Sequence, residues 1–206
     1  MTGSAPRTDA ERNARLWLER DGSPEASAQL ASILGLHPVV ARLLANRKVT
    51  TPEEARTFLE PRLRDMPDPF LMKGMREAVA RILAALDRGE RVCVWGDYDV
   101  DGITSASQLT LFFEAIGVDA SFFVPDRFID GYGLNGDRIR ELAESGVDLL
   151  ITVDCGISNA EEVALAAELG VDVIVVDHHQ VPERVPEAAA VLDPHQSDCA
   201  FPFKGL

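Results

Sequence analysis

The order of apolar and polar residues divides the chain into two parts of different character. Up to about residue 70, short apolar stretches alternate with prolines, which predicts a helical N-terminal lead-in over residues 1–70. Within it, Thr51, Pro52 and Glu54 form the pattern of a capping box with proline in the first turn, so we expect a helix to begin there. A second domain is predicted over residues 71–206.

The second part repeats the rhythm of strand, loop and helix. Its predicted strands are short and almost continuously apolar, and most are followed by a stretch with helical periodicity. Because such strands need cover on both faces, the pattern predicts an α/β fold, a parallel β-sheet with helices on both faces. The predicted strands cover residues 92–95, 120–124, 149–153, 173–176 and 189–192, and the predicted helices cover residues 74–89, 103–116, 136–144 and 160–169.

Acidic residues fall where the predicted strands end. Since the carboxyl ends of parallel strands share one edge, where open sheets bind their ligands, we expect these side chains to meet. Carboxylates this close repel one another unless cations lie between them, and oxygen and imidazole ligands suit Mn²⁺ or Mg²⁺. The pattern predicts a site for one or two ions that hydrolyses a phosphoester. The residues that follow the first, third and fourth strands are Asp97, Asp99, Asp101, Asp154, Asp177, His178 and His179.

The net charge of −14 is concentrated in one half of the chain. Residues 93–206 hold 5 basic and 21 acidic side chains, whereas residues 1–92 hold 15 and 13. An acidic surface disfavours a nucleic-acid partner, but bound cations would offset this charge. Apolar runs such as 188–192 are far shorter than the roughly 18 residues of a membrane span, and the first twenty residues lack the apolar core of a secretory signal. We therefore expect a cytoplasmic protein without a membrane partner.

The first acidic loop admits two other interpretations. Residues 97–102 match the first half of a calcium-binding loop, but Gln108 stands where the bidentate Glu is required, and the loop follows a strand. The loop also approaches the D-x-D-x-[TV] pattern of a phosphatase, except that Asp101 occupies the Thr or Val position. Neither pattern is complete.

Three ordered segments resemble the motifs of the DHH phosphoesterase superfamily and, within it, of the RecJ-type single-stranded-DNA exonucleases. They are residues 96–105 (GDYDVDGITS), 152–158 (TVDCGIS) and 177–179 (DHH). The loop at 126–134, with its Asp-Arg-Phe and Gly-Tyr-Gly-Leu, is similar to the RecJ subgroup as well. The resemblance extends over nearly the whole chain from about Trp17.

This resemblance implies a manganese- or magnesium-dependent exonuclease that degrades single-stranded DNA in the 5′-to-3′ direction to mononucleotides, in recombination and repair. It implies that Asp97 is a metal ligand or supports one, and that His179 holds the scissile phosphate. Arg127 and Tyr132 lie in the glycine-rich loop after the second strand, where a phosphate contact and a base stack are expected. The implied metal ligands are Asp99, Asp101, Asp154 and His178, and these four residues together with His179 are the implied catalytic residues.

The same resemblance implies that the DHH domain is incomplete here. The chain ends before the superfamily's fourth metal-binding aspartate and before the DHH-associated domain, so we expect weak or no activity from this segment alone. The implied partners are single-stranded DNA and a helicase or single-strand-binding protein, and the oligomeric state stays open. Two alternatives remain: a DHH phosphoesterase acting on short oligonucleotides, cyclic dinucleotides or pyrophosphate, and a non-catalytic replication scaffold.

Overall fold

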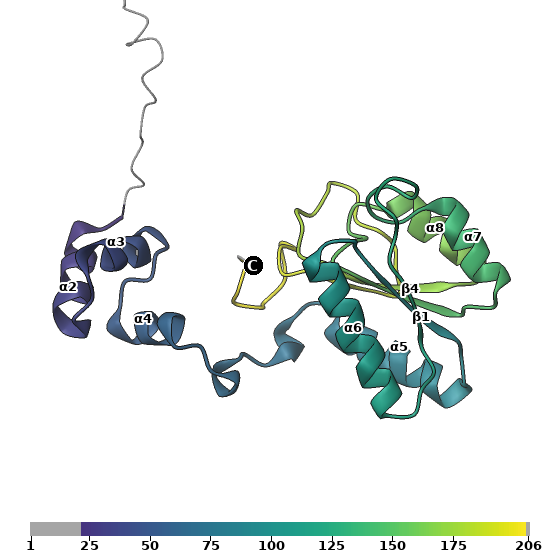
Figure 1. Cartoon of the computed structure of the whole chain (residues 1–206), viewed down its shortest axis with the longest axis horizontal. Coiled ribbons are helices and arrows are strands. Elements are labelled where there is room, and N and C mark those ends of the chain that lie inside the picture. The colour runs from purple at the N-terminus through teal and green to yellow at the C-terminus, as the bar shows by residue number, and fades with distance from the viewer. Residues whose placement is uncertain (1–21, 205–206) are drawn as a thin grey trace, which may run out of the picture. The chain divides into compact units, whose positions relative to one another are not determined.

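A computed structural model describes residues 22–204 of the chain (Figure 1). Trp17, where the family resemblance begins, lies outside these residues. Contacts divide the chain into two compact units, Met1–Met66 and Pro67–Leu206. Within the described range, no helix combines the length and the apolar character that a membrane crossing requires.

The first unit consists of short helices. These are α2 (Pro24–Leu34), α3 (Pro38–Asn46), α4 (Pro52–Leu59) and the 3₁₀ turn η1 (Leu63–Asp65). Proline opens each of the three α-helices, at a position where its missing N–H costs no hydrogen bond. The predicted capping box is present, because Thr51 accepts from the Glu54 backbone and Glu54 reaches back to the Thr51 N–H. A small core holds the helices together through Leu30, Ala41, Leu44 and Ala55.

The second unit contains a five-stranded sheet in which every strand pair is parallel. After η2 (Pro69–Leu71) and α5 (Met75–Arg88), the strands are β1 (Val92–Gly96), β2 (Ser121–Phe123), β3 (Leu149–Val153), β4 (Asp172–Val176) and β5 (Ala190–Leu192). They lie side by side in the order β2-β1-β3-β4-β5. This arrangement confirms the predicted α/β fold with a parallel sheet.

Helices cover both faces of this sheet (Figure 1). The remaining helices are α6 (Val100–Ala115), α7 (Gly136–Glu144) and α8 (Ala160–Glu168). Strand residues such as Val94 and Ile151 pack with α5 and α6, whereas their neighbours Trp95 and Leu150 pack with α7 and α8. Because each central strand is buried on both sides, its sequence is apolar throughout instead of alternating.

Helix α6 begins at Val100, three residues before the predicted start at residue 103. The Asp99 carboxylate caps it by accepting hydrogen bonds from the N–H groups of Asp101, at 2.9 Å, and Gly102, at 3.2 Å. Asp101 therefore lies in the first helical turn and not in a loop. Glycine is disfavoured in helices, but a Cβ at Gly102 would lie 2.3 Å from the backbone nitrogen of Asp97. The close approach of these two backbones explains why glycine occupies this turn.

Candidate metal centre

Four strands end at the same level of the sheet, and an aspartate follows each of them. The backbone register pairs Gly96 with Val153, Val153 with Val176, and Val176 with Leu192. The next residues along the four strands are Asp97, Asp154, Asp177 and Asp193, and all four are buried. Since a carboxylate normally remains in water, four buried aspartates in one row indicate a functional edge.

The first cluster forms where the strand order reverses, between β1 and β3. Asp97 and Asp99 come from the loop after β1, and Asp154 comes from the end of β3. One carboxylate oxygen from each of these three residues lies within 4.8 Å of the other two. Asp97 and Asp154 are buried, while Asp99 is exposed at the start of α6. The predicted meeting of acids that are distant in the sequence therefore occurs in the structure.

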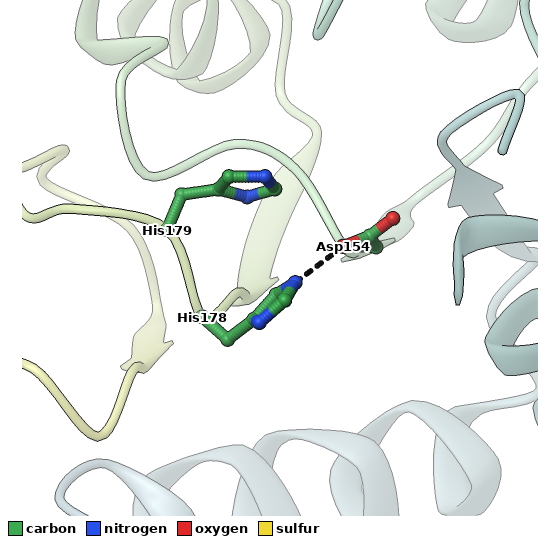
Figure 2. Close-up of side chains that lie close together, drawn as sticks. All are labelled: Asp154, His178 and His179. Atoms are coloured by element: carbon green, nitrogen blue, oxygen red, sulfur yellow. Dashed lines mark hydrogen bonds and ion pairs between the residues drawn. The ribbon is translucent and has the colours of Figure 1, made fainter. Parts of the chain in front are cut away.

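The second cluster adds the two histidines that follow β4 (Figure 2). Ligand atoms of Asp154, His178 and His179 also lie within 4.8 Å of one another. Nε2 of His178 lies 2.8 Å from Oδ1 of Asp154, as the dashed line in Figure 2 marks. Asp154 is thus common to both clusters and joins the carboxylates of the first loop to the imidazoles of the third motif.

Asp177 organises the loop that carries these histidines. Its Oδ1 accepts hydrogen bonds from the backbone N–H groups of His178, at 2.7 Å, and His179, at 3.1 Å. The same oxygen lies 2.7 Å from Nδ1 of the His179 ring, while Oδ2 accepts from the N–H of Ile157 at 2.9 Å. From the sequence, Asp177 is expected at the end of a strand, but no role of its own is predicted for it. The arrangement shows that it fixes both histidines.

The segment that carries Asp154 is held in an uncommon backbone conformation. Asp154 has φ of +62°, in the left-handed region, and its N–H donates to the carbonyl of Val176 at 2.9 Å. Two residues later, a Cβ at Gly156 would lie 2.6 Å from the Thr152 hydroxyl oxygen, which itself donates to the carbonyl of Cys155. These contacts hold Asp154 in the left-handed conformation, at a backbone cost of about 1–3 kcal/mol.

Burial and hydrogen bonding shift the pKa values of these groups, and the direction differs from one group to the next. Burial, together with the neighbouring carboxylate of Asp99, raises the pKa of Asp154 to about 6, although His178 opposes the shift. Burial also raises the pKa of Asp97, whereas the Gly102 N–H lowers the pKa of Asp99. Burial of the His179 ring disfavours its charged form, but the bond to Asp177 outweighs this and raises the pKa of His179.

Several buried carboxylate oxygens in this row have no hydrogen-bond partner. They are Oδ1 of Asp97, Oδ2 of Asp154 and Oδ2 of Asp193. A buried polar atom without a partner costs free energy, and a charged one costs more. Unpaired oxygens beside an imidazole are also the donor set that Mn²⁺ or Mg²⁺ accepts, so the residues present fit a divalent ion.

The remaining predicted site residues lie around these clusters. Asp101 belongs to neither group of three, but it lines a cavity of about 380 Å³ together with Asp154 and His178. The Tyr132 hydroxyl lies 3.4 Å from both ring nitrogens of His179, and the two rings meet edge to face. Arg127 is exposed, and its guanidinium carbon lies 5.5 Å from the ring centroid of Tyr98, a residue that the sequence analysis did not single out.

Comparison with known proteins gives a consistent result. Residues 91–201 match the DHH family, N-terminal domain. The chain is 43% identical over 177 residues to the single-stranded-DNA-specific exonuclease RecJ of Bacillus subtilis, and 40% identical over 172 residues to that of Salmonella typhimurium. The solved structure of RecJ in complex with Mn²⁺ from Thermus thermophilus superposes with a TM-score of 0.62 at 34% identity.

The matches cover most of this chain and a minority of each relative. They include 86% and 83% of this chain for the two sequence relatives, and 82% for the solved structure. The chain spans only 22% and 29% of the length of the two relatives, and 23% of the solved chain. The similarity therefore concerns one part of a much longer architecture.

Proposed function

This chain belongs to the DHH family, and from that premise we propose that it is the catalytic part of a metal-dependent exonuclease. The proposed enzyme hydrolyses the phosphodiester bonds of single-stranded DNA in the 5′-to-3′ direction, releases mononucleotides, and acts in recombination and repair. The names of the relatives from Bacillus subtilis and Salmonella typhimurium support this choice of substrate.

One observation carries the proposal: buried carboxylates and two partly exposed imidazoles, from three distant segments, converge on one edge of the sheet. Asp97, Asp154 and His178 come from the ends of β1, β3 and β4, and two of their oxygens lack any partner. Mn²⁺ is bound by the related protein from Thermus thermophilus. We infer that one or two Mn²⁺ or Mg²⁺ ions are held here. The proposed ligands are Asp99, Asp101, Asp154 and His178, with Asp97 as a further ligand or as support.

When bound, such an ion would offset the negative charge of the phosphate and would lower the pKa of the attacking water. The protein's own contribution is to fix the reacting groups in place. Oδ1 of Asp177 lies 2.7 Å from Nδ1 of His179, and this contact favours the protonated form of the ring. A protonated ring donates a hydrogen bond, so His179 is suited to hold the scissile phosphate.

Two further residues are proposed to handle the strand. Tyr132 is about half exposed and lies directly against His179, so a base of the substrate could stack on its ring beside the scissile phosphate. Arg127 extends from the same loop as an exposed cation and is suited to a backbone phosphate. Both contacts are independent of base identity, as a general exonuclease requires.

We place this activity in the cytoplasm, with single-stranded DNA as the substrate. A helicase or a single-strand-binding protein is the proposed partner, because each works where duplex DNA has been opened. The acidic character of residues 93–206 disfavours a polyanionic substrate without cations. The proposal therefore requires that DNA binding depend on the divalent ion.

The test uses the whole protein that carries this sequence, with Mn²⁺ and a DNA strand labelled at its 3′ end. We expect stepwise release of mononucleotides from the 5′ end of a single strand and none from a blunt duplex. Asp154→Asn should lower the rate by about 100-fold or more, because it removes a shared ligand. Asp198→Asn is the matched control, since Asp198 is an exposed acid paired with Lys73.

Other outcomes would contradict the proposal in different ways. Faster hydrolysis of pyrophosphate, cyclic dinucleotides or very short oligonucleotides than of long single strands would assign the site to a small-substrate phosphoesterase. Binding of Mn²⁺ without hydrolysis of any of these substrates would instead favour a non-catalytic scaffold.

A further inference from the structure

Arg127 is a cation in an acidic setting, yet it pairs with no acid in the described part of the chain. Arg138, in the same half, pairs with Asp130 at 2.9 Å and with Glu141 at 2.7 Å. Within residues 22–204, no carboxylate lies within ion-pair distance of Arg127, and the contact that its guanidinium makes is with the face of Tyr98. The difference calls for a physical reason, because nearby carboxylates attract an exposed cation.

Tyr98 has a position that explains this contact. It lies between Asp97 and Asp99 in the first acidic loop and is partly buried. Its ring contacts the ring of Tyr132 edge to face, with ring centroids 6.4 Å apart. The Tyr132 ring contacts the His179 ring in the same manner, with centroids 6.0 Å apart. The rings therefore form a row that leads from Arg127 to the histidine proposed to hold the scissile phosphate.

The backbone that carries Arg127 is fixed by its own hydrogen bonds. The Phe128 N–H donates to the Asp126 carboxylate at 2.8 Å, and the Asp126 N–H donates to the Asp130 carboxylate at 2.8 Å. The ion pair between Asp130 and Arg138 ties this turn to α7. Because the backbone is restrained, the freedom that remains at Arg127 lies in its long side chain.

A ring beneath the guanidinium restrains that side chain without using its hydrogen bonds. A carboxylate partner would occupy the planar N–H groups, whereas a cation–π contact attracts the charge and leaves those groups free. The freed donors match the two oxygens of a phosphate.

We propose that Tyr98 is a positioning residue that holds the Arg127 guanidinium ready to grip a backbone phosphate of the single-stranded substrate. This inference rests on the proposed function and adds a residue to it. Tyr98 itself acts through Arg127.

The test measures KM and kcat for oligothymidylate hydrolysis by the whole protein with Mn²⁺ over a series of salt concentrations. Arg127→Gln should raise KM and reduce the salt slope of kcat/KM by about 0.7, the value for one phosphate contact on a single strand. Tyr98→Leu should produce much of the same change, and adding it to Arg127→Gln should cause little further loss. Tyr98→Phe should behave as the unmodified protein, because the ring is retained.

Two controls separate positioning from a structural role. Arg140→Gln removes another exposed arginine, on α7, and should leave KM and the salt slope unchanged. Calorimetric Mn²⁺ affinity should be the same in Tyr98→Leu and the unmodified protein, because Tyr98 is not among the proposed ligands. A Tyr98→Leu variant that loses Mn²⁺ binding, or a Tyr98→Phe variant as impaired as Tyr98→Leu, would overturn the inference.

The failure of the inference is distinguishable from the failure of the proposed function. If the unmodified protein degrades single strands but Tyr98→Leu keeps the full salt slope, or if the two substitutions act additively, only the role of Tyr98 is refuted. If the unmodified protein degrades no single strand under any salt condition, the proposed function fails and this inference fails with it.

Discussion

The two units of the chain use their polar side chains for different purposes. In the helical unit, Ser23, His37 and Thr51 each cap the start of a helix and remain at the surface. In the sheet unit, Asp97 and Asp154 are buried at strand ends with oxygens that lack partners. The side chains of the first set accept hydrogen bonds from helix N–H groups. The carboxylates of the second set keep buried oxygens without a hydrogen-bond partner.

This contrast indicates which unit holds the functional site. A cap improves local stability by about 1 kcal/mol and needs no further explanation. Unpaired buried carboxylates reduce stability, so a fold that retains several of them in one row gains something other than stability. A divalent cation would supply the missing partner, which is why the row at the end of the sheet, and not the helical unit, is the candidate site.

The largest expected effect of a single substitution is at Asp177. Asp177→Ala removes the acceptor of three backbone N–H groups and of the His179 ring, so the free energy of unfolding should fall by about 3 kcal/mol. Urea denaturation measures this loss. Asp198→Ala, which removes an exposed acid from the same unit, should cost under about 1 kcal/mol. Equal losses in both variants would mean that the buried aspartate contributes no more to the free energy of unfolding than an exposed one.

Gly102 should be the next most sensitive position. Gly102→Ala would place a Cβ 2.3 Å from the nitrogen and 2.4 Å from the oxygen of the Asp97 backbone, and neither atom can move without displacing β1. We expect a loss of about 2 kcal/mol in unfolding free energy and a weakened metal site. Gly117→Ala is the control, because no atom lies within 4 Å of its Cβ position, although its positive φ adds some strain of its own. A Gly102→Ala variant as stable as the unmodified chain would contradict the close packing of this loop.

The helical unit should respond more weakly and without any effect on metal. Thr51→Ala removes the capping box of α4 and should cost about 1 kcal/mol, measured as a loss of helix by circular dichroism on heating. Mn²⁺ affinity should not change. A change in Mn²⁺ affinity on this substitution would contradict the assignment of metal binding to the sheet unit alone.

The fold could be predicted because its strands are apolar on both faces and are separated by helical stretches with clear glycine stops. The predicted start of α6 was wrong by three residues, because glycine at position 102 disfavours a helix when it is considered alone. The close approach of Gly102 to the Asp97 backbone, which requires glycine there, becomes visible only in the structure. Intrinsic propensity is a weak guide where two backbones touch.

The candidate site was only partly accessible to sequence reasoning. The acids at strand ends could be grouped because a parallel sheet brings such ends to one edge, although the exact register that aligns Asp97 with Asp154 requires the structure. The anchoring role of Asp177 depends on the turn after β4, and the contact between Tyr98 and Arg127 depends on how two loops fold. Neither leaves a signal in residue spacing.

A single divalent-cation site formed by residues distant in the sequence can be tested without any turnover. The most direct measurement is calorimetric titration of this chain with Mn²⁺ and with Ca²⁺, repeated on Asp154→Ala and His178→Ala. We expect Mn²⁺ to bind and each substitution to weaken its affinity by at least about tenfold, because Nε2 of His178 and Oδ1 of Asp154 lie 2.8 Å apart in one site. Equal binding of Ca²⁺ and Mn²⁺ that neither substitution alters would mean that the first loop binds cations alone, and would contradict a shared site.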